Sequence, residues 1–263
     1  MEKYRYYKSA WIFAYDPHLE YKLTDKEVAS LLNKGGMMVR NVYDFDCKEK
    51  TSFWYVIKDS FGGMEELSSK MRNQVKRCFK KMRVEKISAD YLINNGYEVF
   101  VAAAENYRVK AIAPTKDEFE TRIKNGVENE YWGVIDNETD KLVAFSMNAV
   151  TNESCEFRTM KAIPKYQKLY AYYGLIYEMN RYYLVERKIK YVNDGARSIT
   201  NHSNIQPFLI DKFNFRKAYC HLSIKYKWWL GMAVCMLYPF RKLISLRQVK
   251  ALLDMEAMAR GEV

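Results

Sequence analysis

The sequence predicts an α/β protein (α+β) with a mixed, mostly antiparallel central sheet and helices on both faces. Residues 131–135, 142–150 and 155–162 are rich in apolar and β-branched side chains and are joined by short turns, a pattern typical of an antiparallel meander. Residues 168–187 follow with helical spacing, and 189–193 form a short apolar run. A long helix between two strands of one sheet is typical of a crossover connection, so the strand at 189–193 is expected in the same sheet as the meander.

The region before the meander predicts a strand and a basic helix. Residues 51–58 are aromatic and β-branched, which favours a strand. Gly62-Gly63 is expected to open the helix, with Glu65 and Glu66 in its first turn. Its inward stripe comprises Met64, Leu67, Met71, Val75, Cys78 and Met82, which recur three or four residues apart.

The composition predicts a globular protein in a reducing compartment. With 49% hydrophobic residues the chain can bury a core, which excludes a disordered or low-complexity protein. The five cysteines are scattered without a C-x-x-C pair, so we expect neither a disulfide framework nor a metal site. The N-terminal residues lack the apolar stretch of a signal peptide, and we expect a cytoplasmic protein.

Positive charge is concentrated in two segments of a chain whose net charge is +11. Residues 65–87 hold eight Lys or Arg and three Glu, and residues 205–250 hold nine Lys or Arg and one acidic residue. Such charge either serves only solubility or attracts a polyanion. If the basic helix binds tRNA or another polyanion, the expected contacts are Arg72, Arg77 and Lys80.

The C-terminal segment has two interpretations. Residues 228–240 contain no charged residue and are flanked by lysines and arginines. Thirteen residues are too few to span a bilayer. They are expected to form either a helix that covers an apolar groove or an interfacial anchor, in which Trp228 and Trp229 contact an anionic membrane from its inner face.

The order of elements resembles the C-terminal half of GNAT acyltransferases. KLVAFSMNAV at 141–150 is similar to a central strand of that family, and DKFNFRKAY at 211–219 is similar to the element before its last strand. The basic helix at 70–88 resembles one in Fem-type aminoacyl ligases, which carry duplicated GNAT lobes. The resemblance covers about residues 50–225. It implies an N-terminal GNAT-like lobe at 1–110, which can be a partial copy, an acyl-CoA-binding lobe at 111–226 and a helical extension at 227–263.

The resemblance implies an acyltransferase that moves an acyl group from acetyl-CoA, or another acyl-CoA, to a small-molecule amine or sugar amine. Two alternatives remain open: a Fem-type transferase that uses aminoacyl-tRNA, and a GNAT-fold binding or membrane-associated protein without turnover. In the family, a strand-to-helix loop cradles the pyrophosphate of coenzyme A with backbone N–H groups. The matching cofactor-binding residues are Ala162, Ile163, Lys165, Gln167, Lys168, Tyr170 and Asn204.

Two elements depart from the GNAT pattern, the pyrophosphate loop and the position of the proton-donating tyrosine. Tyr170 and Tyr172 stand where the pyrophosphate loop has small residues, which hinders close approach of a phosphate. Ile210 stands where the family has the tyrosine that protonates the departing thiolate, so Tyr219, Tyr173 or water must replace it.

The candidate catalytic residues are Glu156, as a general base, and Tyr219, as an acid. Glu156 and Arg158 are expected on one face of their strand, where an ion pair is the alternative to catalysis. Asp194 and Arg197, after the strand at 189–193, are with Arg158 the candidates for binding the acceptor. A loop stabilised by its own aspartate is the alternative there.

Overall fold

The computed structural model describes residues 3–105, 114–199 and 204–262. The chain forms two compact units, and each draws on separated stretches of sequence, whereas the segments expected from the sequence are contiguous. Unit 1 comprises Met1–Val56, Ala196–Asn204 and Lys217–Val263, and unit 2 comprises Ile57–Gly195 and Ile205–Arg216.

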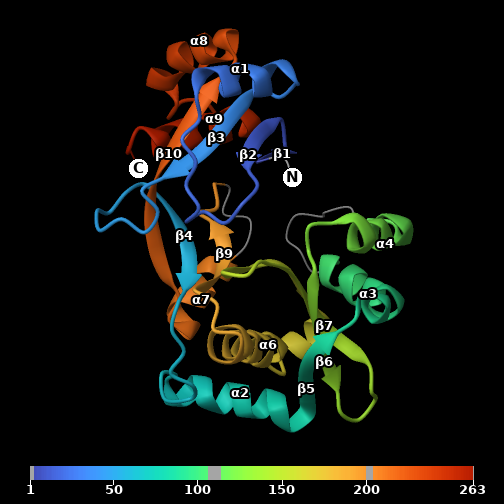
Figure 1. The fold of residues 1–263 in the computed structure, drawn as a ribbon. Coiled ribbons are helices and arrows are strands. Elements are labelled where there is room, and N and C mark those ends of the chain that lie inside the picture. Colours follow the sequence, from blue (N-terminus) through green and yellow to red (C-terminus); the bar gives the residue numbers. More distant parts are fainter. Residues whose placement is uncertain (1–2, 106–113, 200–203, 263) are drawn as a thin grey trace. The chain divides into compact units, whose positions relative to one another are not determined.

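Unit 2 is built on the expected mixed sheet (Figure 1). Its strand order is β9-β8-β7-β6-β5, and neighbours from β5 to β8 pair antiparallel, while β8 and β9 pair parallel. The antiparallel meander is therefore confirmed, and so is a strand after the crossover, β9, in the same sheet. The strands are β5 (Met82–Ile87), β6 (Glu130–Asp136), β7 (Leu142–Val150), β8 (Ser154–Ala162) and β9 (Tyr191–Ala196).

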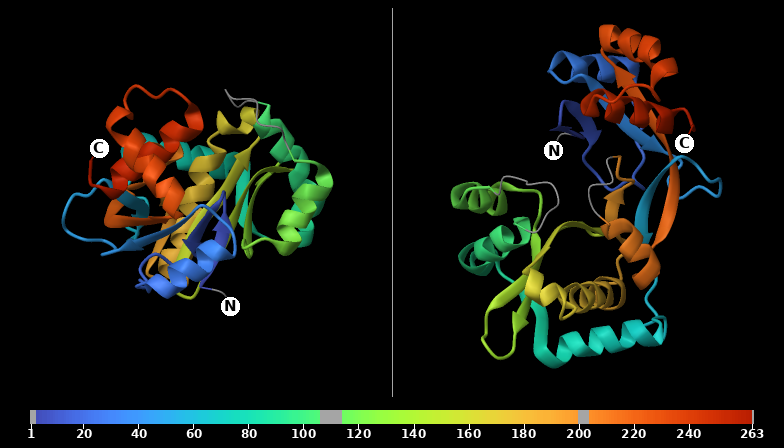
Figure 2. Two further views of the ribbon diagram at one scale, coloured as in Figure 1. Left: turned by 90° about the horizontal axis from the view of Figure 1, so that it is seen from above. Right: turned by 180° about the vertical axis from the view of Figure 1, so that it is seen from behind.

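Helices cover both faces of the meander, as the sequence predicts. Helices α3 and α4 pack on one face, and α6 and α2 lie side by side on the other (Figures 1 and 2). The helices of unit 2 are α2 (Ser69–Lys81), α3 (Ala89–Ala104), α4 (Lys116–Asn125), α5 (Pro164–Gln167), α6 (Ala171–Arg181) and α7 (Ile205–Phe213).

The start of α2 differs from the sequence prediction. The helix begins at Ser69, because the Ser68 hydroxyl accepts a hydrogen bond from the Met71 N–H and so caps the first turn. Glu65 and Glu66 therefore precede the helix. Glu66 instead forms an ion pair of 3.0 Å with the buried Lys58.

The crossover is also not one continuous helix over residues 168–187. Tyr170 adopts a left-handed backbone conformation with φ of 68°, which separates α5 from α6. After Arg181 the chain continues as the π-helix η1 (Tyr182–Glu186). Such widened turns occur often near functional sites, and here the turn carries Tyr183 into the core.

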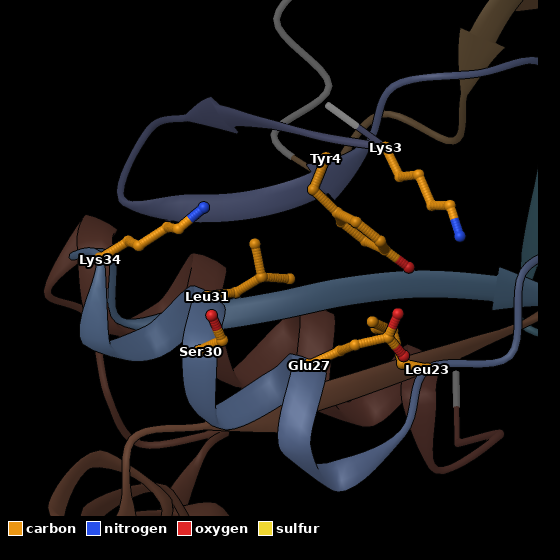
Figure 3. Close-up of a pocket in the computed structure, with 7 residues that line it drawn as sticks. All are labelled: Lys3, Tyr4, Leu23, Glu27, Ser30, Leu31 and Lys34. Atoms are coloured by element: carbon orange, nitrogen blue, oxygen red, sulfur yellow. The ribbon is translucent and has the colours of Figure 1, made fainter. Parts of the chain in front are cut away.

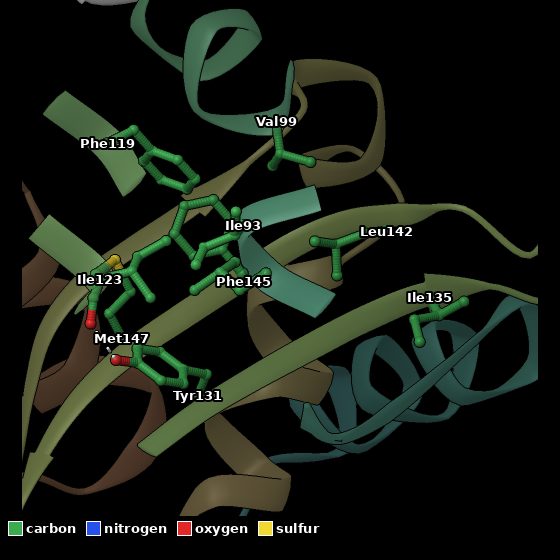
Figure 4. Packing of buried hydrophobic residues seen from close by; sticks show 10 residues of the cluster. Ile93, Val99, Phe119, Ile123, Tyr131, Ile135, Leu142, Phe145 and Met147 are labelled. Atoms are coloured by element: carbon green, nitrogen blue, oxygen red, sulfur yellow. Dashed lines mark hydrogen bonds between the residues drawn. The ribbon is translucent and has the colours of Figure 1, made fainter. Parts of the chain in front are cut away.

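The two faces of the meander have different interiors. On the α3–α4 face the core is apolar, with Phe119 against Phe145 and Ile93, Ile135 and Met147 around them (Figure 4). On the α6 face a polar cluster surrounds the fully buried Tyr183.

The Tyr183 hydroxyl is the centre of that cluster. It accepts hydrogen bonds from Trp132 Nε1 at 2.9 Å and Asn148 Nδ2 at 3.3 Å, and donates one to Glu130 at 3.0 Å. Lys86 and Arg187 pair with the same glutamate. The cluster thus joins three elements, β6, β7 and η1, through one hydroxyl.

In unit 1, β3 pairs parallel with β2 and antiparallel with β10. The elements of unit 1 are β1 (Tyr4–Tyr7), β2 (Ala10–Phe13), α1 (Asp25–Asn33), β3 (Met38–Tyr43), β4 (Phe53–Lys58), β10 (Arg216–Tyr226), α8 (Trp228–Leu237), the 3₁₀ helix η2 (Tyr238–Phe240) and α9 (Arg247–Ala259).

Gly174 allows α6 to pack closely on α2. A Cβ atom at this position would lie 2.3 Å from the Sγ of the buried Cys78. We expect Gly174→Ala to lower the free energy of unfolding by about 1–3 kcal/mol, because a filled interface must shift to accept the methyl group. Urea unfolding measures this change.

Two variants control the interpretation of Gly174→Ala. Gly231→Ala adds a methyl group to α8 at an ordinary contact distance of 3.6 Å and should not destabilise. Adding Cys78→Ala to Gly174→Ala should recover part of the loss. Equal effects of Gly174→Ala and Gly231→Ala would contradict the packing role.

Candidate functional site

The candidate site begins where β8 and β9 separate. Their parallel pairing runs from Ser154 opposite Tyr191 to Glu156 opposite Asn193 and ends there. Strand β8 nevertheless continues to Ala162. Within the described part of unit 2, β8 does not pair with β9 beyond Glu156. Two carbonyls of this stretch instead accept side-chain hydrogen bonds, Met160 from the Tyr172 hydroxyl at 3.5 Å and Ala162 from Gln167 Nε2 at 3.1 Å. A strand that leaves its neighbour in this way can offer backbone groups to a ligand.

A β-bulge lies at the point of separation. Phe157 pairs with Asn148 of β7, and Thr159 pairs with Met147, so Arg158 is the extra residue between them. A bulge bends its strand and increases the local twist, which turns β8 away from β9. Bulges are common beside active sites for this reason.

Asp194 lies at this opening, two residues before the end of β9. Burial and, to a smaller extent, the nearby Glu156 carboxylate raise the pKa of Asp194 to about 8, although a hydrogen bond with Gln206 of α7 opposes the rise. A carboxyl group with a pKa near neutrality can exchange protons with a reacting amine.

Glu156 is held differently from Asp194. Its carboxylate forms an ion pair of 2.7 Å with Arg158, the bulged residue on the same strand. The expected alternative of an ion pair at this position is thus present in the structure. The pair keeps negative charge beside Asp194, although Arg158 partly offsets it.

The strand-to-helix loop after β8 holds six of the seven expected cofactor-binding residues. Ala162 ends β8, Ile163 caps α5, and Lys165 and Gln167 lie within α5. Lys168 and Tyr170 occupy the turn that precedes α6. The seventh, Asn204, lies just before α7 and belongs to unit 1.

Most backbone N–H groups of this loop are bonded within the protein. Those of residues 166–170 all donate to carbonyls of residues 163–167, and Ile163 donates to Val143. The first helical residues of α6, Ala171 and Tyr172, have no acceptor within their own helix. A phosphate therefore meets fewer donors here than in a glycine-rich loop.

The remaining expected residues belong to unit 1, which is described separately. Arg197 donates through Nη1 to the Ser52 carbonyl at 2.6 Å, and its guanidinium lies 4.2 Å from the centre of the Trp54 ring. Tyr219 packs edge-on against the same tryptophan. Both side chains thus contribute to a cluster around Trp54.

The basic face of α2 is exposed except at Arg72. The Arg72 guanidinium donates to the Leu67 carbonyl at 2.7 Å and to the Ser69 hydroxyl at 3.1 Å, so it stabilises the start of its own helix. Arg77 and Lys80 are exposed on α2. They, rather than Arg72, are available to a polyanion.

A shallow pocket in unit 1 lies between α1 and the N-terminal strand (Figure 3). The hydroxyl of the buried Tyr4 points toward it and has no hydrogen-bond partner. Glu27 also lines the pocket, and hydrogen bonds from Tyr21 and Thr24 lower its pKa to about 2. Because Glu27 completes a capping box with Thr24, its carboxylate already has a structural role.

The described residues contain neither a metal-binding cluster nor a membrane-spanning helix. No three His, Cys, Asp or Glu side chains in these ranges gather as a metal ion would require. Nor does any described helix have the length and apolar character needed to cross a bilayer.

Comparison of the whole chain with solved structures decides the fold. The C-terminal domain of a protein assigned as a lysylphosphatidylglycerol synthetase, from Agrobacterium fabrum, matches with a TM-score of 0.53 and 12% identity over 88% of this chain and 83% of that one. FemX matches with a TM-score of 0.53 and 8% identity over 82% and 81%. The chain has a GNAT-like fold.

A third solved structure extends the GNAT-like match over nearly the whole chain. L-PGS from Bacillus licheniformis has a TM-score of 0.51 and 12% identity over 98% of this chain and 85% of that one. Protein-family models and curated proteins give no match to the sequence. All three solved structures share 12% identity or less with this chain, so they show its fold and not its activity.

Sequence reasoning missed three features of the site: the bulge at Arg158, the contact of Gln206 with Asp194, and the internal bonding of the loop. The alternation of residue types along β8 does not show where the extra residue of the bulge lies, so the bulge could not be predicted from it. Gln206 is distant from Asp194 in sequence, so only the docking of α7 brings them together. By contrast, the presence of Tyr170 in the sequence already indicated that this loop lacks the usual glycine.

Asp194 makes the stability of the protein depend on pH. Since its folded-state pKa of about 8 exceeds the ordinary value of 3.8, the folded form holds a proton that the unfolded chain loses. Its contribution to stability should therefore fall as pH rises from about 4 to about 8.

We expect Asp194→Asn to remove this decline and to raise the free energy of unfolding at pH 8 by about 1–3 kcal/mol. Urea unfolding at several pH values measures it. Asp211→Asn, on the exposed side of α7, is the matched control. Parallel pH profiles for the unmodified protein and Asp194→Asn would contradict the assignment.

Proposed function

We propose that the protein is an acyltransferase that joins an activated acyl or aminoacyl group to a small-molecule amine or sugar amine. The observation that supports this proposal is the opening between β8 and β9, where the pairing of the two strands ends beside Asp194 and Glu156. Backbone N–H groups at such an opening can stabilise the oxyanion that forms as an acyl carbon is attacked.

Asp194 is the proposed base, with a pKa raised by burial and, in addition, by the Glu156 carboxylate. The amine nitrogen attacks the acyl carbon, and the Asp194 carboxylate takes the proton that the nitrogen loses. The tetrahedral intermediate then expels the donor's thiolate or ribose oxygen, and the same proton passes to the leaving group. Glu156, which the sequence suggested as the base, is paired with Arg158 and so is less suited to accept a proton.

The donor belongs to one of two classes: an acyl-CoA, such as acetyl-CoA, or an aminoacyl-tRNA. The loop favours aminoacyl-tRNA, since the N–H groups of residues 166–170 are bonded internally and Tyr170 and Tyr172 occupy the small-residue positions. The exposed Arg77 and Lys80 of α2 supply charge for a polyanion. If acyl-CoA is the donor, Lys165, Lys168 and the first turn of α6 are the groups that bind its phosphates.

We also propose that the chain works in the cytoplasm, at or near the inner face of the membrane. The five free cysteines suit a reducing compartment. Acyl-CoA and aminoacyl-tRNA are both intracellular donors, and a basic protein is attracted to an anionic membrane surface.

Parallel assays with radiolabelled acetyl-CoA and a mixture of aminoacyl-tRNAs test the donor. We expect transfer from aminoacyl-tRNA, and expect Arg77→Glu with Lys80→Glu to weaken tRNA binding about tenfold or more, with a smaller salt dependence. Lys225→Glu with Lys242→Glu makes the same charge change away from α2. Transfer from acetyl-CoA that Lys168→Glu weakens would identify acyl-CoA instead, and transfer from neither donor would contradict the proposed function.

The pH dependence of transfer tests the base. We expect Asp194→Asn to lower kcat by about 10²–10⁴-fold, which is the usual contribution of a general base. Glu156→Gln should keep activity and move the rising limb of the pH–rate profile to lower pH, because a like charge beside Asp194 is removed. If Glu156→Gln loses activity while Asp194→Asn keeps it, the two roles are reversed.

A further inference from the structure

Helix α8 has two apolar faces. One face comprises Leu230, Val234 and Tyr238, which pack with Leu253 and Ala257 of α9 in the core of unit 1. Residues four apart lie on the same side of a helix, and residues two apart lie on nearly opposite sides. The face with Trp228, Met232 and Met236 is therefore turned away from that core.

This second face is exposed in the structure. Trp228 is 75% exposed and Leu243, in the segment that follows α8, is 83% exposed. Together α8 and this segment present eight large apolar side chains to solvent, which we call the α8 surface: Trp228, Trp229, Met232, Met236, Leu237, Phe240, Leu243 and Leu246. Single exposed apolar residues are ordinary, but a contiguous group of this size marks an interaction site.

The sequence around the α8 surface is strongly basic. No Asp or Glu occurs in the sequence between Asp211 and Asp254. Lys225 precedes α8, and Lys242, Arg247 and Lys250 follow it, all exposed. Two acidic residues from the C-terminal helix region pair with neighbouring cations, Asp254 with Lys250 and Glu262 with Arg241, so the free cations near the apolar side chains include, among the described residues, Lys225, Lys242 and Arg247. Large apolar side chains with tryptophan at one end and cations around them match the interface of an anionic bilayer, where acyl chains meet phosphate groups.

The charge also argues against a second copy of this chain as the occupant. In a twofold-symmetric contact the same patch faces itself, so these cations would be brought toward one another. An anionic lipid surface instead places phosphate opposite each cation.

We propose that the α8 surface is an interfacial membrane-binding site that inserts Trp228, Met232, Met236, Phe240 and Leu243 among the lipids of an anionic bilayer. The helix lies in the plane of the interface and does not cross it, since ten residues are too short to span a membrane. The inner face of α8 stays on α9, so binding requires no unfolding. Both interpretations of 228–240 thus hold at once, one for each face.

Co-sedimentation of the full chain with vesicles tests the proposal. We expect binding to phosphatidylglycerol–phosphatidylcholine vesicles and little binding to pure phosphatidylcholine, with affinity falling as salt rises. Brominated lipids should quench tryptophan fluorescence on binding, and Trp228→Ser with Trp229→Ser should remove most of that quenching.

Two sets of variants separate the apolar and the charged contributions. Trp228→Ser with Met232→Ser and Met236→Ser should lower vesicle affinity about tenfold or more. Lys242→Glu with Arg247→Glu should lower it about tenfold at low salt. Tyr6→Ser with Tyr7→Ser removes two exposed aromatic side chains elsewhere in unit 1 and should leave binding unchanged.

All substituted positions are exposed, so circular dichroism should show that the variants keep the fold. Absence of binding to anionic vesicles, or binding that the α8 variants leave unchanged, would overturn the proposal. Concentration-dependent dimers that the Trp228 variant abolishes, without vesicle binding, would identify a second copy as the occupant. None of these measurements depends on turnover. Vesicle binding can therefore be confirmed or excluded even if the protein does not catalyse the proposed transfer reaction.

Discussion

The parallel pairing of β8 with β9 is the constraint on which the arrangement of unit 2 depends. Parallel neighbours cannot be joined by a hairpin, so the chain must leave β8 and return across the sheet through α5, α6 and η1. That crossover brings the loop after Ala162 to the end of β8 and places α6 on one face of the meander. The pairing then stops at Glu156, and the bulge at Arg158 turns the strands apart. A site at this place follows from the topology.

Two buried polar sites of unit 2, around Tyr183 and around Asp194, are compensated to different degrees. Around Tyr183, the hydrogen bonds from Trp132 and Asn148 and to Glu130 satisfy a fully buried hydroxyl, so the cluster mainly fixes the positions of strands and helix. The negative charge of Asp194 is stabilised less completely. Burial and the neighbouring Glu156 carboxylate both disfavour this charge, and a single hydrogen bond, with Gln206, favours it. An incompletely compensated acid costs stability and keeps a proton available, which suits a group that must transfer one.

Helix α8 shows how a single short element meets two environments. Its composition is apolar on every side, which ordinarily indicates a helix buried in a core or a membrane. Packing on α9 satisfies only the side that carries Val234. The cations around the other side explain why it can remain exposed without favouring self-association. The proposed lipid contact and the proposed transfer reaction thus use different residues.

The sequence by itself determined the strands of the meander, the crossover after it, the basic helix and the apolar C-terminal segment, because these follow from local periodicity and charge. It also indicated a loop with Tyr170 in place of glycine. It placed the start of α2 too early, since the choice between Gly63 and Ser68 depends on a single capping hydrogen bond. Only the tertiary structure decided which polar residues act together. The contact of Asp194 with Gln206, the bulge at Arg158 and the two faces of α8 all depend on pairing and packing between segments distant in sequence, which local residue patterns do not encode.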